Sequence, residues 1–128
     1  MEEYMFSLNE VTLRPLEFDD IDTLYDWSAS IELEMLAGWG SRQSRAAYRQ
    51  RYERRITEPE DDLDMFGIVV EGRLVGNVQL ALIDQKERRA AVGIVIGEKQ
   101  VWGRGIGSTA LRLLLTICAN HVVGRFDP

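Results

Sequence analysis

The sequence predicts an α+β fold, in which a mixed, mainly antiparallel sheet is flanked by helices. The first observation is a series of three strand-like segments between Met65 and Ile96 that are joined by short polar turns. Short turns connect strands that are antiparallel neighbours. The second observation is that the last of these strands leads through a glycine-rich turn into a leucine-rich helix. The other helical patterns precede these three strands, and this segregation of helices from strands is typical of α+β proteins.

The N-terminal part of the chain predicts a strand and a helix. Val11–Arg14 alternates apolar and polar residues and stops at Pro15, which indicates a first strand. Asp19 or Asp20 can cap a following helix, because a short acidic side chain accepts hydrogen bonds from the free amides at a helix start. The apolar residues of that helix have the spacing of one helical face: Ile21, Leu24 and Tyr25.

A second helix is predicted from Ser41, its candidate cap, to about Thr57. The segment before it can continue the first helix until Gly38 interrupts the pattern. Pro59 and a run of acidic residues end the second helix in a solvated loop. Its apolar stripe is narrow, with residues at intervals of four: Tyr48, Tyr52 and Ile56.

A hairpin and a third strand follow. Met65–Val70 and Leu74–Ile83 have the composition of paired strands, and Glu71-Gly72 between them indicates a tight turn. The charged segment Asp84–Arg89 then turns the chain into a strand that ends at Ile96. Three consecutive strands of this kind predict an antiparallel meander.

The final helix is predicted from Ser108, and it is apolar on more than one face. Its one polar stripe is formed by Ser108, Arg112, Thr116 and Asn120. We therefore expect most of the helix circumference to be covered by protein. From His121 onward the chain offers at most one short strand.

Three glycines at alternate positions, Gly103, Gly105 and Gly107, connect the third strand to this helix. Without Cβ atoms, they permit positive φ angles and let a ligand approach the backbone. The free amides of the first helical turn and the positive end of the helix dipole converge on the same place. Such a place binds phosphate or pyrophosphate, although many strand-to-helix turns contain glycine without any ligand.

Two familiar phosphate-binding motifs do not match this turn. A P-loop requires Lys followed by Ser or Thr after its last glycine, whereas Gly107 is followed by Ser108 and Thr109. A dinucleotide fingerprint requires G-x-G-x-x-G, whereas the chain has G-x-G-x-G. The candidate anion site is therefore of another kind.

The segment formed by Ile94–Ile96, six further residues and Gly103–Ser108 resembles the acyl-CoA signature of the GNAT superfamily of N-acyltransferases, which is written Q/R-x-x-G-x-G/A. Trp102 stands where Gln or Arg is expected, and this departure is similar to the branch that acetylates ribosomal-protein N-termini and small amines. The opening of the chain, a strand, Arg-Pro-Leu and an acid-capped helix, is also similar to the start of family members.

The resemblance implies an N-acetyltransferase that moves an acetyl group from acetyl-CoA, its cosubstrate, to a primary amine of a protein N-terminus or a small molecule, with no metal. The amides of Arg104–Ser108 would hold the pyrophosphate, and the exposed backbone of Ile94–Ile96 would pair with the pantetheine arm like an extra strand. The predicted coenzyme-binding residues are Ile94, Val95, Ile96, Gly103, Arg104, Gly105, Ile106, Gly107 and Ser108.

The acid and base of such a reaction are not evident from the sequence. Many relatives place a Glu two residues before the glycine of this strand, and Ala91 stands at the matching position. Glu87, Glu98 or a chain of waters are alternatives that the spacing does not distinguish, so the catalytic residues stay unknown.

Family members normally continue beyond this helix with further strands and often a tyrosine that protonates the leaving thiolate, so the resemblance implies a chain that is shortened relative to the family. A second function therefore stands beside the first: a non-catalytic acyl-CoA-binding or dimeric interaction module derived from this fold. An exposed strand edge and a broadly apolar helix favour association, so a homodimer is predicted, with or without exchanged elements.

With 128 residues the chain is expected to form a single GNAT-like domain over residues 1–128. No apolar run reaches the ~20 residues of a membrane span, and the N-terminus lacks the basic start of a secretory signal, so no membrane contact is expected. A cytoplasmic location is expected because a single cysteine cannot form an internal disulfide. Cys118 is the one cysteine and is interpreted as a core residue. His121 is the one histidine, which argues against a metal site.

The net charge of −6 argues against non-specific binding of nucleic acid, but the charge is unevenly distributed. Residues 1–40 hold ten acids and Arg14 alone, whereas residues 42–55 hold six arginines and Glu53. The basic helix either is solvated and faces the acidic segments or binds an acidic or phosphorylated partner.

Overall fold

A computed structural model of the chain describes the backbone of residues 6–35, 43–84, 86–87 and 89–126, with their side chains except at 31–35, 82 and 118–126. The chain divides into two compact units, one formed by Met1–Pro15 with Glu60–Pro128 and the other by Leu16–Pro59. Each unit is described by itself below, and the single domain expected over residues 1–128 stays a prediction.

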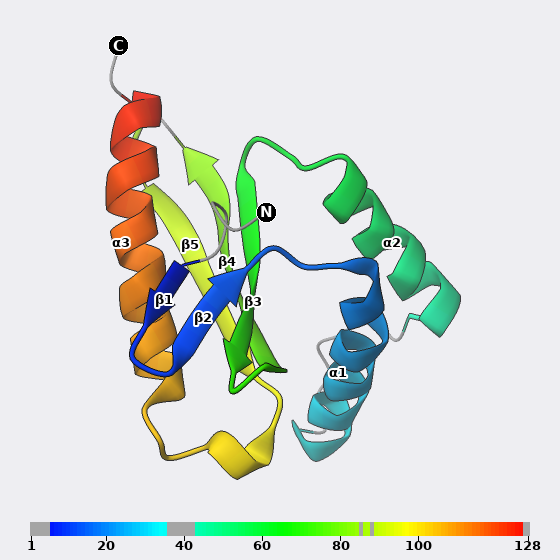
Figure 1. Ribbon diagram of the computed structural model, residues 1–128. Helices are drawn as coiled ribbons and strands as arrows, with labels where there is room; N and C mark the ends of the chain where they lie inside the picture. The colour runs from blue at the N-terminus through cyan, green and yellow to red at the C-terminus, as the bar shows by residue number, and fades with distance from the viewer. Residues whose placement is uncertain (1–5, 36–42, 85, 88, 127–128) are drawn as a thin grey trace. The chain divides into compact units, whose positions relative to one another are not determined.

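The first unit is built on a five-stranded sheet (Figure 1). The strands lie in chain order, and each is antiparallel to its neighbour. The predicted α+β fold with a mainly antiparallel sheet is confirmed. The strands are β1 (Phe6–Leu8), β2 (Val11–Arg14), β3 (Leu63–Val70), β4 (Arg73–Asp84) and β5 (Arg89–Ile96).

β1 is a strand that the sequence did not predict. Phe6 pairs with Leu13 of β2, and only Asn9 and Glu10 connect the two strands. Asn9 has a φ of 56°, a conformation that asparagine adopts more readily than most residues. Three residues carry too little alternation to be recognised as a strand, so β1 is defined by its pairing with β2.

The hairpin of β3 and β4 has the predicted turn. Glu71 and Gly72 have φ angles of 53° and 78°, as a two-residue turn of type I′ requires. Both strands are longer than predicted, because Leu63 of β3 still pairs with Ala81, and the end residues of β4, Arg73 and Asp84, pair with Val70 and Arg89.

Gly76 lets the end of β5 approach β4 closely. It lies opposite Ile96, and a Cβ atom added at Gly76 would overlap the carbonyl oxygen of Val95. The Val75 carbonyl then accepts hydrogen bonds from the amides of Gly97, at 2.8 Å, and Glu98, at 3.3 Å. The point where the chain leaves β5 is therefore fixed to β4 by main-chain contacts.

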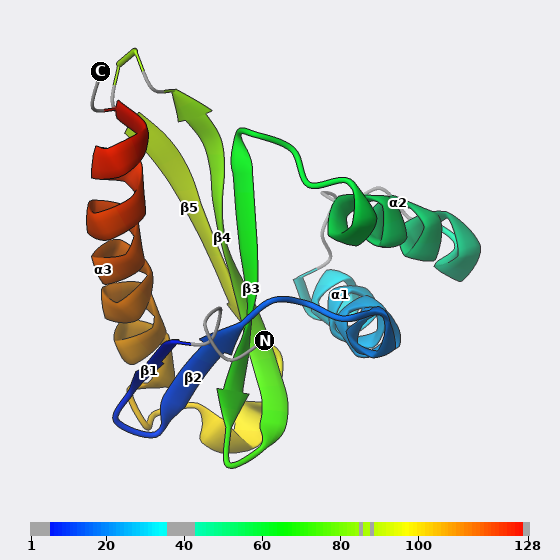
Figure 2. The ribbon, with the colours of Figure 1, turned by 45° about the horizontal axis from the view of Figure 1, so that its top comes forward.

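α3 (Ile106–Phe126) covers one face of the sheet (Figure 2). The apolar core between them contains Val11, Leu13, Ile68, Val70, Val75, Val78, Val101, Ile106, Ala110, Leu113, Leu114 and Ile117. The expectation that most of the α3 circumference would be covered is wrong for Leu115, whose side chain is 52% exposed. Ser108, Arg112 and Thr116 are exposed, as the polar stripe predicted.

The bounds of α3 differ from the prediction at both ends. The helix begins at Ile106, two residues before Ser108, and it continues to Phe126 where the sequence offered at most a short strand. Extension of an existing helix needs no new nucleation, so weak helix formers after His121 can still join it. The side chains of Cys118 and His121 lie outside the described residues.

The second unit contains a 3₁₀ turn, η2 (Phe18–Asp20), and two helices, α1 (Ile21–Met35) and α2 (Arg45–Thr57). At the start of η2 the carboxylate of Asp20 accepts a hydrogen bond from the amide of Glu17 at 2.8 Å, so Asp20 acts at the helix start without being the N-cap residue itself. The cap of α2 is Ser44, whose hydroxyl accepts from the amide of Ala47 at 3.1 Å. The predicted cap Ser41 was therefore wrong, and residue 41 lies outside the described residues.

Gly76→Ala is expected to lower the free energy of unfolding by about 1–3 kcal/mol, because a methyl group must push β5 away from β4. Urea unfolding followed by circular dichroism measures the change. Gly93→Ala is the matched control in β5, since its added Cβ would meet only the flexible side chain of Gln79 at 3.3 Å. Equal unfolding free energies for the two variants would contradict the role given to Gly76.

Candidate functional site

The candidate site lies where the chain passes from β5 into α3. A short 3₁₀ turn, η3 (Lys99–Val101), follows β5, and the glycine turn then leads directly into the helix. A pocket of about 410 Å³ opens here and is lined by Ile96, Val101, Trp102, Gly103, Gly105, Ile106, Gly107 and Ser108. Six of the nine predicted coenzyme residues are therefore brought together, and Ile94, Val95 and Arg104 lie outside the lining.

Two glycines give the turn its shape. Gly103 and Gly105 have φ angles of 84° and 75°, a region that L side chains rarely adopt. A Cβ atom added at either residue would meet no atom within 4 Å, so the space in front of the turn is open. These glycines are thus required by the backbone conformation, and their lack of side chains leaves the main chain accessible.

The amides of Ile106, Gly107 and Ser108 are the free donors of this site. The first hydrogen bond of α3 runs from the amide of Thr109 to the carbonyl of Gly105 at 3.0 Å, so the three preceding amides have no intrahelical acceptor. The helix dipole adds a partial positive charge at the same place. Among the described residues, no backbone acceptor is found for these three amides, and they can therefore bind an anion.

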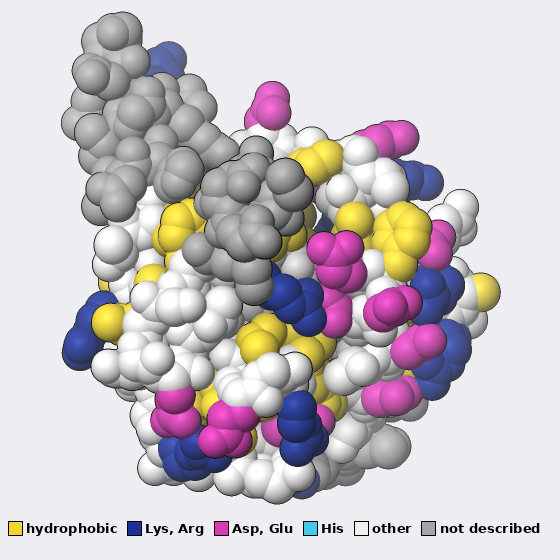
Figure 3. All heavy atoms as spheres, in the orientation of Figure 1, with side chains coloured by type: hydrophobic (Ala, Val, Ile, Leu, Met, Phe, Trp, Pro, Cys, Tyr) yellow, Lys and Arg dark blue, Asp and Glu magenta, His cyan; other side chains and the backbone are white. Residues whose placement is uncertain are grey.

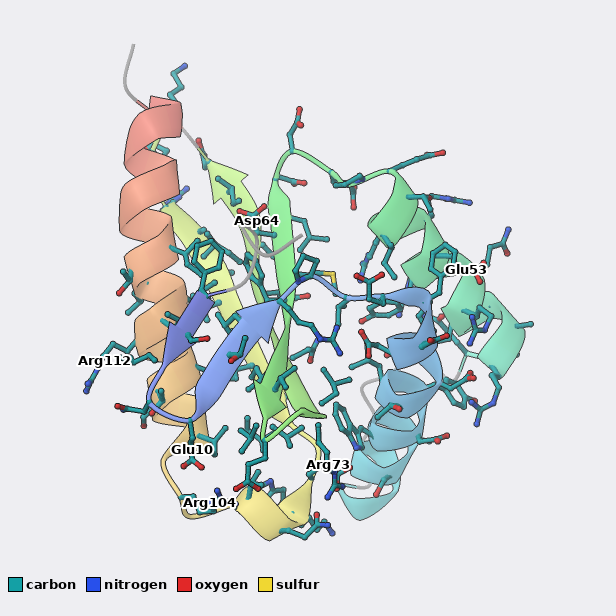
Figure 4. All side chains as sticks on the ribbon, in the orientation of Figure 1. Glu10, Glu53, Asp64, Arg73, Arg104 and Arg112 are labelled. Carbon is teal, nitrogen blue, oxygen red and sulfur yellow. The ribbon has the colours of Figure 1, made fainter. Side chains whose placement is uncertain are left out.

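Arg104 is less available than the sequence suggested. Its amide donates to the carbonyl of Val101 at 3.3 Å. Its guanidinium forms an ion pair with Glu10, Nη2 to Oε1 at 2.5 Å, and Figure 4 shows the two side chains pointing toward one another. Each side chain is 41% exposed. Glu10 belongs to the turn between β1 and β2 and was not predicted as part of the site, because residues so far apart in sequence share no local pattern.

Trp102 holds the glycine turn against the end of β5. Its indole Nε1–H donates to the carbonyl of Ile96 at 3.0 Å, while the ring remains 56% exposed. The Lys99 ammonium lies 5.9 Å from the ring centroid, at the outer limit of a cation–π contact. The sequence marked Trp102 only as a departure from a motif, and the structure gives it a positioning role.

β5 is the last strand in the order of the sheet, so within the described residues its outer edge has no neighbouring strand. Its side chains are unusually apolar for an edge, with Val92 43%, Ile94 38% and Val95 37% exposed. Ile94 and Ile96 point to the same face and lie beside Gly107, where a Cβ atom would be 3.9 and 4.0 Å from their side chains. This edge is free to pair with an extended ligand.

No acid–base group lines the pocket, whose only side-chain hydroxyl is that of Ser108. Ala91 lies near the start of β5 and pairs with Ala81 just before the register of the β4–β5 ladder shifts, so the position that carries a Glu in many relatives contributes no carboxylate. Glu98 is near the pocket end of β5, where its carboxylate lies 3.4 Å from Arg73. Glu87 lies in the turn at the opposite end of β5. No catalytic base is assigned.

Two other classes of site find no support in the part of the chain that the structure describes. No group of three or more His, Cys, Asp and Glu side chains is arranged to hold a metal ion among those residues. No described helix is long and apolar enough to cross a bilayer.

Several solved structures with similar folds are described as acetyltransferases. One described as a "Probable acetyltransferase" is 26% identical, with a TM-score of 0.72, and the match covers 94% of this chain and 69% of that one. The ribosomal L7/L12 alpha-N-protein acetyltransferase RimL, in complex with coenzyme A, is 16% identical with a TM-score of 0.74, over 96% of this chain and 82% of RimL. The microcin C7 self immunity acetyltransferase MccE, in complex with acetyl-CoA and AMP, is 15% identical with a TM-score of 0.71, over 94% and 79%.

These likenesses place the fold among the acetyltransferases. The family model of the acetyltransferase (GNAT) domain matches residues 10–126, and the chain therefore belongs to the GNAT family. No curated protein matches the chain. The resemblance drawn from the glycine turn is confirmed at the level of family and fold.

The ion pair between Glu10 and Arg104 leads to a prediction for phosphate affinity. Glu10→Gln is expected to tighten the binding of coenzyme A about two- to fivefold, because the carboxylate no longer competes with a phosphate for Arg104. Isothermal titration calorimetry at low salt measures the change. In an Arg104→Ala background the same substitution is expected to have a much smaller effect, and an unchanged or weaker affinity for Glu10→Gln alone would show that Glu10 does not compete with the ligand.

Proposed function

We propose that this chain is an acetyl-CoA-dependent N-acetyltransferase that acts on the primary amine of a protein N-terminus or of a small molecule. The observation that carries the proposal is the open pocket at the start of α3, with free main-chain amides and no side chain in front of Gly103 or Gly105. Membership of the GNAT family supplies the reaction class. RimL and MccE, which share the fold, contain coenzyme A and acetyl-CoA respectively.

In this proposal the amides of Ile106, Gly107 and Ser108 hold the pyrophosphate of the coenzyme. The pantetheine arm is itself a peptide-like chain, and its amides would pair with the outer edge of β5 at Ile94–Ile96. The exposed apolar side chains of β5 would then be partly covered by the bound coenzyme. Arg104 would join the phosphate contacts only by leaving Glu10.

The transfer itself needs a neutral amine. The amine nitrogen attacks the thioester carbonyl carbon, the C–S bond breaks, and the thiolate of coenzyme A leaves and takes up a proton. An amine with a pKa of ~10 is mostly charged at neutral pH, so its proton must be removed before attack. Glu98 is the carboxylate nearest to the pocket along the chain, and its Oε1 lies 3.4 Å from Nη2 of Arg73. It could remove that proton only through water or after a rearrangement.

A second candidate function is supported by the same pocket. None of its lining residues ionises in the physiological pH range, and Ala91 replaces the Glu that many relatives carry. A non-catalytic acyl-CoA-binding or dimeric interaction module would need only the amides and the strand edge.

The homodimer likewise remains a proposal. The exposed side chains of Val92 and Val95 on β5 and of Leu115 on α3 favour it.

The test combines binding with turnover. Titration calorimetry with acetyl-CoA, followed by a thiol-release assay with a panel of amines and N-terminal peptides, should give binding and then release of coenzyme A with at least one acceptor. Binding without release for the whole panel would favour the non-catalytic module. Absence of binding would remove the transferase and the acyl-CoA-binding module, and would leave only a dimeric interaction module.

The matched variants are Gly105→Val and Gly72→Val. Both glycines have positive φ, 75° and 78°, and neither has an atom within 4 Å of an added Cβ, so both substitutions strain the backbone alike by about 1–3 kcal/mol. Only Gly105→Val is expected to abolish coenzyme binding, because its side chain would occupy the space of the phosphates. Equal loss in both variants would point to a general effect on folding, and retained binding in Gly105→Val would place the phosphates elsewhere.

A further inference from the structure

α2 carries a strongly positive charge on a negative protein. It contains five arginines, Arg45, Arg49, Arg51, Arg54 and Arg55, and one acid, Glu53, whereas the whole chain has a net charge of −6. Figure 3 shows Lys and Arg side chains interspersed with Asp and Glu over the unit that contains α1 and α2. Which of these arginines have acidic partners decides whether the charge is available to a ligand.

The first two arginines of α2 are neutralised inside the unit. Arg45 pairs with Asp22 at 3.1 Å and with Asp26 at 2.8 Å, both on α1. Arg49 pairs with Asp22 at 3.0 Å and with Glu53 at 3.2 Å. The hydrogen bonds from Arg49 and Arg45 hold the pKa of Asp22 below its ordinary value. For these two residues the interpretation of a basic helix that faces acidic segments is confirmed.

The last three arginines of α2 have no carboxylate partner among the described side chains. Arg51 and Arg54 are exposed and Arg55 is half-buried. Residues at i, i+3 and i+4 lie on one side of a helix, so these three guanidinium groups gather near the C-terminal end of α2. We call Arg51, Arg54 and Arg55 the free arginine group.

Tyrosine rings hold two of these guanidinium groups in place. The guanidinium carbon of Arg51 lies 5.6 Å from the ring centroids of both Tyr48 and Tyr52, and that of Arg55 lies 5.2 Å from Tyr52. The two rings stack at 4.6 Å and are buried. A guanidinium over an aromatic face keeps its N–H groups free for a carboxylate, and it loses less conformational entropy on binding.

We propose that the free arginine group binds a carboxylate-rich segment of a protein or peptide acceptor. This inference rests on the proposed N-acetyltransferase function and names the class of acceptor that the chain prefers. Two or three neighbouring Asp or Glu side chains would accept bidentate hydrogen bonds from Arg51, Arg54 and Arg55. A small neutral amine would make none of these contacts.

The size and surroundings of the group favour a short acidic peptide over nucleic acid. From Arg51 to Arg55 the helix rises about 6 Å, which spans two or three carboxylates but no extended track of phosphates. The chain as a whole has a net charge of −6, which opposes a long polyanion more strongly than a short peptide.

The direct test measures how tightly the whole chain, without coenzyme, binds a short fluorescent peptide that contains a run of glutamates. Fluorescence anisotropy reports the binding. The triple variant Arg51→Gln, Arg54→Gln, Arg55→Gln is expected to weaken binding at least about tenfold, since three exposed charge pairs together contribute on that order. Binding of the unchanged chain should weaken as salt is added. The corresponding triple lysine variant keeps the charge and should retain part of the affinity.

The matched control removes three positive charges elsewhere, by Lys86→Gln, Arg89→Gln and Arg112→Gln, all at exposed residues of the other unit. The outward position of Arg112 on α3 is visible in Figure 4. The control should bind the acidic peptide as the unchanged chain does. Equal loss in both triple variants would overturn the proposal, because net charge alone would then explain the binding.

Two further readouts separate this inference from the proposed function. If the chain is active, the free-arginine variant should raise KM for an acidic peptide acceptor about tenfold with kcat unchanged, and should leave a small amine acceptor unaffected. If the unchanged chain shows no turnover but the variant still loses peptide binding, the free arginine group is supported as a binding site and the transferase function is removed. Preferential binding of a single-stranded RNA, with no binding of the glutamate peptide, would overturn the inference.

Discussion

The proposed site depends on one set of groups, the main-chain amides at the start of α3 that have no acceptor in the helix. Their availability is the combined result of several contacts. Positive φ angles at Gly103 and Gly105 turn the chain, the indole of Trp102 ties the turn to the Ile96 carbonyl, and Gly76 allows that end of β5 to lie against β4. Since a helix start is a preformed anion site only when nothing covers it, the open space in front of the turn matters as much as the amides.

Binding and proton transfer require different groups at this site. In the proposed function, binding would come from the backbone, in the amides of α3 and the outer edge of β5, and would need no particular side chain. Proton transfer needs an ionisable side chain, and the pocket lining offers none. A GNAT fold with this arrangement would depend on holding the amine and the thioester together, because orientation alone can lower a barrier substantially. Charge on α2 would contribute to the same end by retaining an acidic acceptor.

Much of the fold could be read from the sequence, because alternation in β3 to β5 and the glycine turn are local signals. The family resemblance rested on the same local signals. Contacts between distant residues could not be read in this way. Glu10 meets Arg104 across 94 positions, and nothing in either neighbourhood indicates the pair. β1 was missed because three residues carry no pattern, the cap of α2 was placed at Ser41 instead of Ser44, and the covering of α3 was overestimated at Leu115. Which arginines of α2 are neutralised depends on the register between two helices, which the sequence does not contain.

The most direct measurement of the central claim is a titration of the ¹⁵N-labelled chain with coenzyme A, followed by two-dimensional NMR. If the amides of Ile106, Gly107 and Ser108 bind the pyrophosphate, their resonances should move most and in the downfield direction, as expected for stronger hydrogen bonds to an anion. Pantetheine without phosphates should shift residues of β5 and leave those three amides nearly unchanged. Shifts that are absent at the start of α3, or equal for both ligands, would contradict the account.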